Sequence, residues 1–346
     1  ESRSGDHETE VREELGILLN DDPEVYGNIQ AKQEILDRYV RSCRRYVSGR
    51  RIRVRLSDLA RNLECKADWL TGCLKEQEWI SGENGEGWFN SYYDDHGHAV
   101  EGFFPDGVRM MLTGQVFAIM GNVATASQIS SIVRSADHYL YRKEIGGYRL
   151  NTDFHELKFD MGRMFGFAYG EKENGAVFSH MTVMFANALY RRGFAREGWK
   201  ALKTLAETAL DFDTSRIYPG IPEYFRADGR GMYHYLTGAA SWYMLTMVTQ
   251  VFGVRGEAGD LIFDPKLCAE QFDEQGRASV CVSFAGRDLE ITYENTGRKE
   301  YGDYATGFAV CGGVELSLAD DGRAIMPRRM LDELSDGVHH IIIKLI

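Results

Sequence analysis

Three long segments with helical periodicity, at about 176–193, 195–210 and 238–253, constrain the fold of this chain most. Each repeats apolar residues at the spacing that lines one face of a helix. Successive antiparallel helix pairs of this length are typical of an α/α toroid, in which the loops at one end of the ring gather together. The segments therefore predict a helical scaffold that presents connecting loops on one side.

The chain before these helices is also mostly helical in its patterning. Amphipathic or apolar stretches predict helices at 25–47, 56–80, about 107–120 and about 124–140. The aromatic run Trp88–Tyr93 precedes an Asp-Asp-His-Gly turn sequence, which predicts a strand, a turn and a returning strand at 98–103. Two successive glycines then predict a break that leads into a loop at 148–153.

The pattern changes after Gly259. Short runs rich in β-branched and aromatic residues follow, with turns between them, at 261–263, 278–284, 289–293, 308–318 and 338–345. Such runs predict a small antiparallel sheet domain. We therefore expect a mainly α protein with a β domain, divided into a helical catalytic portion at 1–258 and a C-terminal β domain at 259–346.

The charge of the chain limits its partners. A net charge of −12 over 346 residues argues against nucleic acid. The basic run Arg38–Arg55 is a local exception, which we interpret as a solvated helix face and a loop. No apolar run approaches the roughly 20 residues that span a bilayer. Neither nucleic acid nor a membrane is an expected partner.

The cysteines and the first residues bear on location. Six cysteines are scattered without a CxxC pair, which predicts reduced thiols in a cytoplasmic protein and no metal site. The chain opens on the acidic stretch Glu1–Glu14 rather than on a signal peptide, and it does not begin with Met. We therefore expect a cytoplasmic protein, and the sequence leaves open whether residue 1 is the native start.

Two short motifs at the starts of long helices suggest the chemistry. Glu173 and His180 place a carboxylate and an imidazole about two helical turns apart. Thr237 and Gly238 place a hydroxyl and a bare backbone amide at the start of the next helix. Unsatisfied amides and the helix dipole both favour negative charge at a helix N-terminus. Together the motifs predict a phosphate held beside a sugar.

These motifs and their neighbours resemble a known family. The segments are Gly87–Asp94, Lys172–His180, Tyr235–Trp242, Val251–Val254 and Gly259–Pro265. In order and spacing they resemble the inverting glycoside phosphorylases related to cellobiose phosphorylase, glycoside hydrolase family 94, and are most similar to the 1,2-β-oligoglucan phosphorylase branch. The resemblance covers most of 60–266. It implies that the chain holds part of an (α/α)6 barrel, followed by a C-terminal β domain.

The resemblance also implies an activity. It implies a glycosyltransferase-type phosphorylase that cleaves β-glucosidic bonds in glucose di- or oligosaccharides with inversion and releases α-glucose 1-phosphate. His180, Thr237 and Gly238 would bind phosphate, and Glu173 would hold the sugar. The partners would be a β-linked gluco-oligosaccharide and inorganic phosphate as co-substrate, with no cofactor. Family members are often homodimers, so a homodimer or a further N-terminal portion is expected.

The general acid is the open part of this assignment. Inverting transfer needs an acid on the leaving oxygen and a nucleophile on the opposite face of the sugar, and phosphate needs no base because it is already anionic. The family's acid lies in a Trp-Asn-Asp motif, where this chain has Leu19-Asn20-Asp21. The candidates are Asp21, Asp94 and a residue that precedes residue 1. The family's N-terminal sandwich, first barrel helices and a phosphate-binding arginine have no counterpart here.

Each candidate also has a purely structural interpretation. Trp88 would stack on a sugar or pack in the core, and Asp94 would act as an acid or serve its turn. Arg216 and Glu223, on a loop before the third helix, would bind the acceptor sugar. Glu173 and Thr237 would otherwise cap helices, and His180 would be a core residue.

Two other functions stay open. An inverting hydrolase on the same toroid needs a second carboxylate about 6.5–9.5 Å from the first, to leave room for water. Asp94, Asp95 and Glu223 are the available partners. A non-catalytic fragment that only binds carbohydrate is the other alternative, since an incomplete toroid exposes apolar helix faces.

Overall fold

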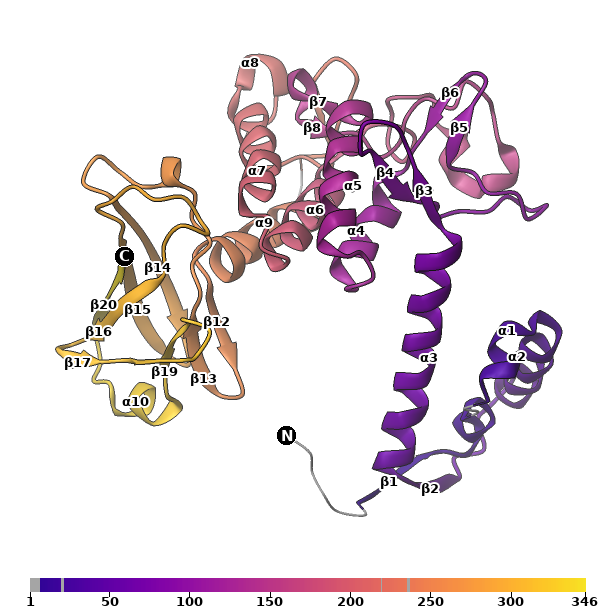
Figure 1. Ribbon diagram of the computed structural model, residues 1–346, viewed down its shortest axis with the longest axis horizontal. Coiled ribbons are helices and arrows are strands. Elements are labelled where there is room, and N and C mark those ends of the chain that lie inside the picture. The colour runs from indigo at the N-terminus through magenta and orange to yellow at the C-terminus, as the bar shows by residue number, and fades with distance from the viewer. Residues whose placement is uncertain (1–6, 20–21, 219, 235–236) are drawn as a thin grey trace. The chain divides into compact units, whose positions relative to one another are not determined.

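The computed structural model describes residues 7–19, 22–218, 220–234 and 237–346 (Figure 1). The chain divides into two compact units, 1–79 and 80–346. The predicted domain boundary at 258 falls inside the second unit, in the turn between β12 (Val254–Glu257) and β13 (Asp260–Phe263). The division into a catalytic portion and a β domain stays a prediction.

The first unit contains a two-stranded ribbon and several helices. In chain order its elements are β1 (Glu8–Arg12), a 3-10 turn (Glu13–Leu18), α1 (Pro23–Gly27), α2 (Ile29–Cys43), β2 (Arg51–Arg55) and α3 (Leu56–Gln77). The Asn28 side chain caps α2 by accepting from the backbone N–H of Ala31 at 3.0 Å. On α3, the Trp69 ring lies 5.9 Å from Tyr26. The predicted helices at 25–47 and 56–80 are confirmed, with a break at Asn28.

The two-stranded ribbon of β1 and β2 contains part of the basic run Arg38–Arg55. Strands β1 and β2 pair antiparallel, so glutamates of one lie beside arginines of the other. Arg53 lies 3.8 Å from Glu8, and Arg51 lies 3.6 Å from Glu10. The expected loop is therefore partly a strand. Apolar residues alternate with the arginines of β2, and the charge run concealed this period-2 signal.

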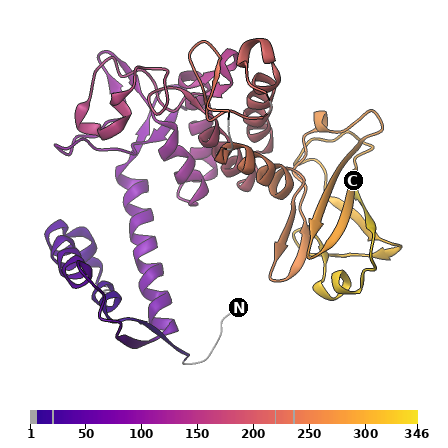
Figure 2. The ribbon, with the colours of Figure 1, turned by 180° about the vertical axis from the view of Figure 1, so that it is seen from behind.

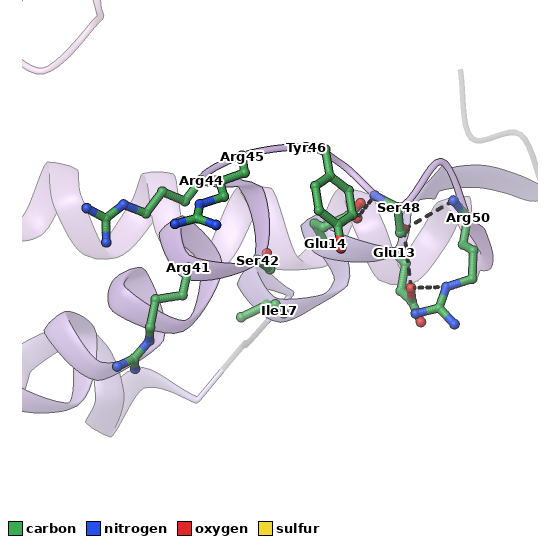
Figure 3. Close-up of a pocket in the computed structure, with 10 residues that line it drawn as sticks. All are labelled: Glu13, Glu14, Ile17, Arg41, Ser42, Arg44, Arg45, Tyr46, Ser48 and Arg50. Atoms are coloured by element: carbon green, nitrogen blue, oxygen red, sulfur yellow. Dashed lines mark hydrogen bonds and ion pairs between the residues drawn. The ribbon is translucent and has the colours of Figure 1, made fainter.

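The rest of the basic run surrounds a concave surface at the end of α2, with a volume of about 820 Å³. Figure 3 shows the guanidinium groups of Arg41, Arg44 and Arg45 at one end and the Glu13–Arg50 ion pair, at 2.7 Å, at the other. The three arginines are exposed. Cations are favoured at a helix C-terminus, so these residues fit the predicted solvated helix face.

The second unit begins with its helical part (Figures 1 and 2). The helices are α4 (Leu112–Met120), α5 (Ala126–Tyr139), α6 (Ser179–Arg191), α7 (Ala195–Leu210), α8 (Phe212–Ser215) and α9 (Gly238–Thr246), which continues as a π-helical turn (Met247–Val251). Further 3-10 turns are Lys143–Ile145 and Phe159–Gly166. The five helices predicted for this part are confirmed with shorter ends.

Helix α6 is the core helix of this part. It packs against α4, α7 and α9. Its apolar residues are buried almost throughout, including Val183, Phe185 and Leu189. The one buried amide, Asn187, donates from Nδ2 to Oγ1 of Thr246 on α9 at 3.0 Å. Burial on several sides fixes the position of the residues at its N-terminus.

Short strands connect the helices. The pairs are β3 (Trp79–Ser81) with β4 (Gly87–Phe89), β5 (Gly102–Phe104) with β6 (Gly107–Arg109) and β7 (Tyr141–Arg142) with β8 (Gly147–Tyr148); a three-stranded sheet has the order β11 (Gly231–Met232), β10 (Tyr224–Phe225), β9 (Val177–Phe178). The predicted pairing of 88–93 with 98–103 is wrong, apart from a bridge between Tyr93 and Ala99. Side chains compete for the backbone donors there, because Asn90 Oδ1 accepts from Val100 and Glu101 at 3.2 Å.

Two sheets follow α9. One has the order β12-β13-β19-β18, with β18 (Ser317–Leu318) and β19 (Ala324–Met326); the other has the order β14-β15-β20-β16-β17, with β14 (Arg277–Phe284), β15 (Arg287–Glu294), β16 (Thr306–Cys311), β17 (Val314–Glu315) and β20 (Val338–Leu345). A 3-10 turn (Ala269–Gln271) and α10 (Arg328–Glu333) complete this part. The β-rich pattern is confirmed, but β15 and β20 are parallel, which corrects the expected antiparallel sheet. The 43 residues between them supply the long crossover that parallel pairing requires.

One glycine joins the helical part to the sheets. Gly253 has φ +66°, and an added Cβ would lie 1.9 Å from the carbonyl oxygen of Asp264. The two chain segments are hydrogen-bonded here, since the N–H of Asp264 donates to the carbonyl of Gly253 at 3.0 Å. Only glycine combines this conformation with this close approach.

Candidate functional site

The loop that carries Glu173 is held by buried amides. Asn151 Nδ2 donates to Asn174 Oδ1 at 3.1 Å, and Asn151 Oδ1 accepts from the N–H of Gly175 at 2.8 Å. Gly175 has φ +72°, and an added Cβ would lie 2.2 Å from the Tyr169 ring. This network fixes the loop just before β9 and α6, and so fixes the position of Glu173.

His180 is the second residue of α6. Strand β9 pairs with β10 directly before the helix, and the N–H of Ser179 donates to the carbonyl of Glu223 at 2.9 Å. Within the described residues, the buried atoms His180 Nε2 and Ser179 Oγ have no hydrogen-bond partner. A buried polar atom without a partner is costly, so His180 Nε2, on a half-buried side chain, is available to a polar ligand.

The start of α9 lies against this histidine. A Cβ added to Gly238 would be 3.0 Å from both Cε1 and Nδ1 of His180. Thr237 precedes the helix, and its hydroxyl donates to the carbonyl of Ile221 at 3.5 Å. Two sequence motifs 57 residues apart therefore meet, and the structure brings His180, Thr237 and Gly238 together.

The electrostatics of this place favour an anion. Burial lowers the pKa of His180 below its ordinary value, so the imidazole is neutral near pH 7 and keeps one N–H donor. The helix dipoles of α6 and α9 add partial positive charge at their starts. Neutral and dipolar donors at adjoining helix starts can hold a phosphate without a formal cation.

Glu173 has one paired and one unpaired oxygen. Its Oε1 lies 3.2 Å from a guanidinium nitrogen of Arg163. Its Oε2 is buried and has no hydrogen-bond partner among the described residues. An acceptor held in this way suits a sugar hydroxyl, which would donate to it. Sequence patterns predicted no role for Arg163, because the ion pair depends on a loop that periodicity does not predict.

Trp88 does not lie in this site. Its side chain is fully buried, and its ring packs 5.3 Å from Phe103 and 5.8 Å from Tyr139. A ring without exposed surface cannot stack on a sugar, so the predicted binding role of Trp88 is corrected to a packing role. An aromatic residue in a short strand does not reveal from sequence which of its faces is covered.

The Asp94 carboxylate stabilises the turn that contains it. Its Oδ1 accepts from the backbone N–H groups of His96 and His98 at 2.9 Å each, and its Oδ2 lies 3.6 Å from Nζ of Lys158. The hydrogen bond from the N–H of His98, followed by the other donors, lowers the pKa of Asp94 to about 2. A carboxyl group that stays ionised at neutral pH is unsuited to donate a proton. The geometry therefore argues against the predicted catalytic role of Asp94.

We expect Asp94→Asn to lower the melting temperature at pH 7. Because the folded-state pKa lies below the ordinary 3.8, the carboxylate contributes stability above about pH 4 and loses it as the pH falls through 2. The difference in melting temperature from the unsubstituted protein should shrink over this range, measured by thermal unfolding between pH 7 and pH 2. A constant difference, or lost turnover at unchanged stability, would contradict the structural role.

The remaining predicted residues are spread out. Glu223 lies at the start of β10, where its carbonyl contacts the start of α6, so it borders the site. Arg216 is exposed at the end of α8, with φ +53°. Asp95 is in the Asp94 turn, and Asp21 lies outside the described residues. Trp242, whose ring lies 5.5 Å from His180, borders the site, although no role was predicted for it.

Among residues 7–19, 22–218, 220–234 and 237–346, no group of three His, Cys, Asp or Glu side chains has a geometry that could hold a metal ion. None of the helices in this described part combines the length and the apolar character that crossing a bilayer requires.

Comparison with known proteins identifies the family. Residues 56–253, more than half of the chain, match the catalytic domain of the glycosyl hydrolase 94 superfamily. The chain belongs to this family, as the sequence motifs predicted. The 1,2-β-oligoglucan branch is not singled out and stays a prediction.

Three curated relatives are phosphorylases. The chain is 26% identical over 226 residues to a cellobionic acid phosphorylase of Neurospora crassa, covering 61% of this chain and 27% of the relative. It is 24% identical to a 3-O-β-D-glucopyranosyl-β-D-glucuronide phosphorylase (53% and 25% covered) and 27% identical to a solabiose phosphorylase (51% and 24% covered), both of Paenibacillus borealis. The chain thus spans about a quarter of the length of these relatives.

Proposed function

We propose that this chain takes part in the phosphorolysis of β-glucosidic bonds in glucose di- or oligosaccharides, with inversion and release of α-glucose 1-phosphate. One observation carries the proposal, which is the contact of Gly238 with the imidazole of His180 at the joined N-termini of two helices. These helix starts suit phosphate, and the unpaired Oε2 of Glu173, on the loop before α6, suits a sugar hydroxyl. Membership of the family supports the same reading.

The chemistry needs few groups. A phosphate oxygen attacks the anomeric carbon from the face opposite to the bond that breaks, and the leaving glycosidic oxygen takes a proton from a general acid. The residues at His180 position the phosphate and offset its repulsion, so no base is required. We assign the acid to Asp21 or to a residue that precedes residue 1, because Asp94 is held ionised by its turn.

The scaffold belongs to the same proposal. We propose that α4 to α9 form part of an (α/α)6 barrel whose loops carry the site. The proposal also includes the substrates, inorganic phosphate as sole co-substrate, a homodimer and a cytoplasmic location. The curated relatives are longer than this chain, which is consistent with an acid and further barrel helices outside residues 1–346.

The test is an assay of phosphate-dependent product release. The chain is incubated with short β-linked glucose oligomers, with and without phosphate, and glucose 1-phosphate and free glucose are measured. Release of glucose 1-phosphate only with phosphate supports the proposal. Equal cleavage without phosphate would contradict it and favour the inverting hydrolase. Sugar binding without turnover in a folded chain would favour a non-catalytic carbohydrate-binding fragment.

A further inference from the structure

A second concave site lies elsewhere in the second unit. It has a volume of about 490 Å³ and is formed by the C-terminal half of α6, by α9 and its π-helical turn, and by the segments around β12 and β13. On α6, Asn187 and Arg191 follow His180 by 7 and 11 residues, which places them about 10 and 16 Å further along the helix axis. The charged end of this site is therefore separate from the candidate phosphate site, while Trp242 borders both.

The charges in this site do not balance. Its lining includes Arg191, Arg255 and Lys266, and its one lining carboxylate among the described residues is Asp264. Arg255 and Lys266 both contact the same oxygen, Oδ2 of Asp264, at 3.0 Å. The Lys266 side chain is only 10% exposed. Three cationic side chains and one carboxylate leave a net positive charge next to the buried ammonium group of Lys266.

An anionic ligand would offset this charge. Burying a cation without full compensation is costly, and a phosphate group can accept charge-assisted hydrogen bonds from arginine and lysine together. The site is larger than a phosphate alone needs, and its volume is within the range of small-ligand sites. The Trp242 indole and the Asn187 amide also line it, and both groups suit a sugar ring.

We propose that this site binds a small phosphorylated sugar, with the phosphate on Arg191, Arg255 and Lys266 and the sugar ring toward Trp242. The proposal does not rest on the proposed function, because the charged groups of this site differ from the residues of the His180 site, although Trp242 borders both. It assigns a ligand to residues that the phosphorolysis reaction does not require.

Calorimetric titration of the folded chain with α-glucose 1-phosphate tests the proposal. We expect two bound molecules per chain, with the His180 site alone weakened in His180→Ala and the second site alone weakened in Arg191→Gln. Arg191→Gln should weaken the second site about tenfold or more, the loss expected for a charge-assisted hydrogen bond. Arg191→Lys should bind more tightly than Arg191→Gln. Arg329→Gln, an equal charge change at an exposed position of α10, should leave both sites unchanged.

Two further probes define the ligand. Inorganic phosphate should bind the second site more weakly than α-glucose 1-phosphate, and glucose should not bind it. Equal affinities for phosphate and α-glucose 1-phosphate would overturn the sugar part of the proposal. Loss of all binding in His180→Ala, or unchanged binding in Arg191→Gln, would overturn the site itself. If the unsubstituted chain bound α-glucose 1-phosphate only at the second site, the result would contradict the proposed function and support this proposal.

Discussion

Replacing His180 with alanine is expected to weaken phosphate binding about tenfold or more, because one well-aimed hydrogen bond to a charged ligand contributes about 1.5–3 kcal/mol. Where turnover is measurable, kcat/KM for phosphorolysis should fall by about 10²-fold or more, as when an anion-stabilising donor is lost. The measurements are calorimetric titration with phosphate and the release of glucose 1-phosphate. His155→Ala, at an exposed position, is the matched control and should change neither value.

A second variant, Gly238→Ala, tests the position of the His180 ring separately from the presence of its imidazole. Gly238→Ala keeps the imidazole but adds a methyl group about 3.0 Å from its ring, so the ring must shift. Phosphate affinity should fall while the melting temperature stays equal or rises, since alanine is favourable in a helix. Gly72→Ala on α3, where an added Cβ meets nothing within 4 Å, controls for the helical effect. Unchanged phosphate affinity in both His180→Ala and Gly238→Ala would refute the assignment of this site.

Gly253→Ala is expected to lower the free energy of unfolding by about 3 kcal/mol or more, a larger loss than for Gly238→Ala or Gly286→Ala. The new Cβ would lie 1.9 Å from a backbone oxygen, so the segment before β12 and the segment after β13 must separate. Urea unfolding followed by circular dichroism measures the effect.

The control is a glycine with the same conformation and free space. Gly286 has φ +75°, and an added Cβ would meet nothing within 4 Å. Gly286→Ala should cost only about 1–2 kcal/mol, the expense of a left-handed conformation for an L-residue. If the two variants lost equal stability, conformational strain alone would account for Gly253 and the close approach would be irrelevant.

The sequence predicted the helices well because their apolar periodicity is sustained over many residues. It also predicted that His180 and Gly238 act at helix starts, and the packing of α6 against α9 brings those starts together. What it missed depends on tertiary contacts. Periodicity did not reveal that Trp88 faces the core or that Trp242 touches His180, since neither depends on sequence spacing.

The pairing partners of the strands also could not be predicted from the sequence. An alternating pattern identifies a strand but not its neighbour, so the parallel pairing of β15 with β20 could not be predicted. The turn at Asp94 was recognised, yet its effect on acidity depends on two backbone donors that only the folded turn brings to the carboxylate. Periodicity also does not decide between Asp21, which lies outside the described residues, and a residue before residue 1 as the acid.

The strand order of the larger sheet has a consequence for how the protein is made. Residues 338–345 form its middle strand, between β15 and β16. A ribosome that has produced everything up to residue 337 has therefore made the two flanking strands without the one that joins them. Until then each carries an open edge with unpaired amide and carbonyl groups, which other chains could pair with. Translation pausing or premature termination in this short stretch would leave a chain with an intact helical part and a sheet that lacks its middle strand. The unpaired edges of that sheet would promote association with other chains.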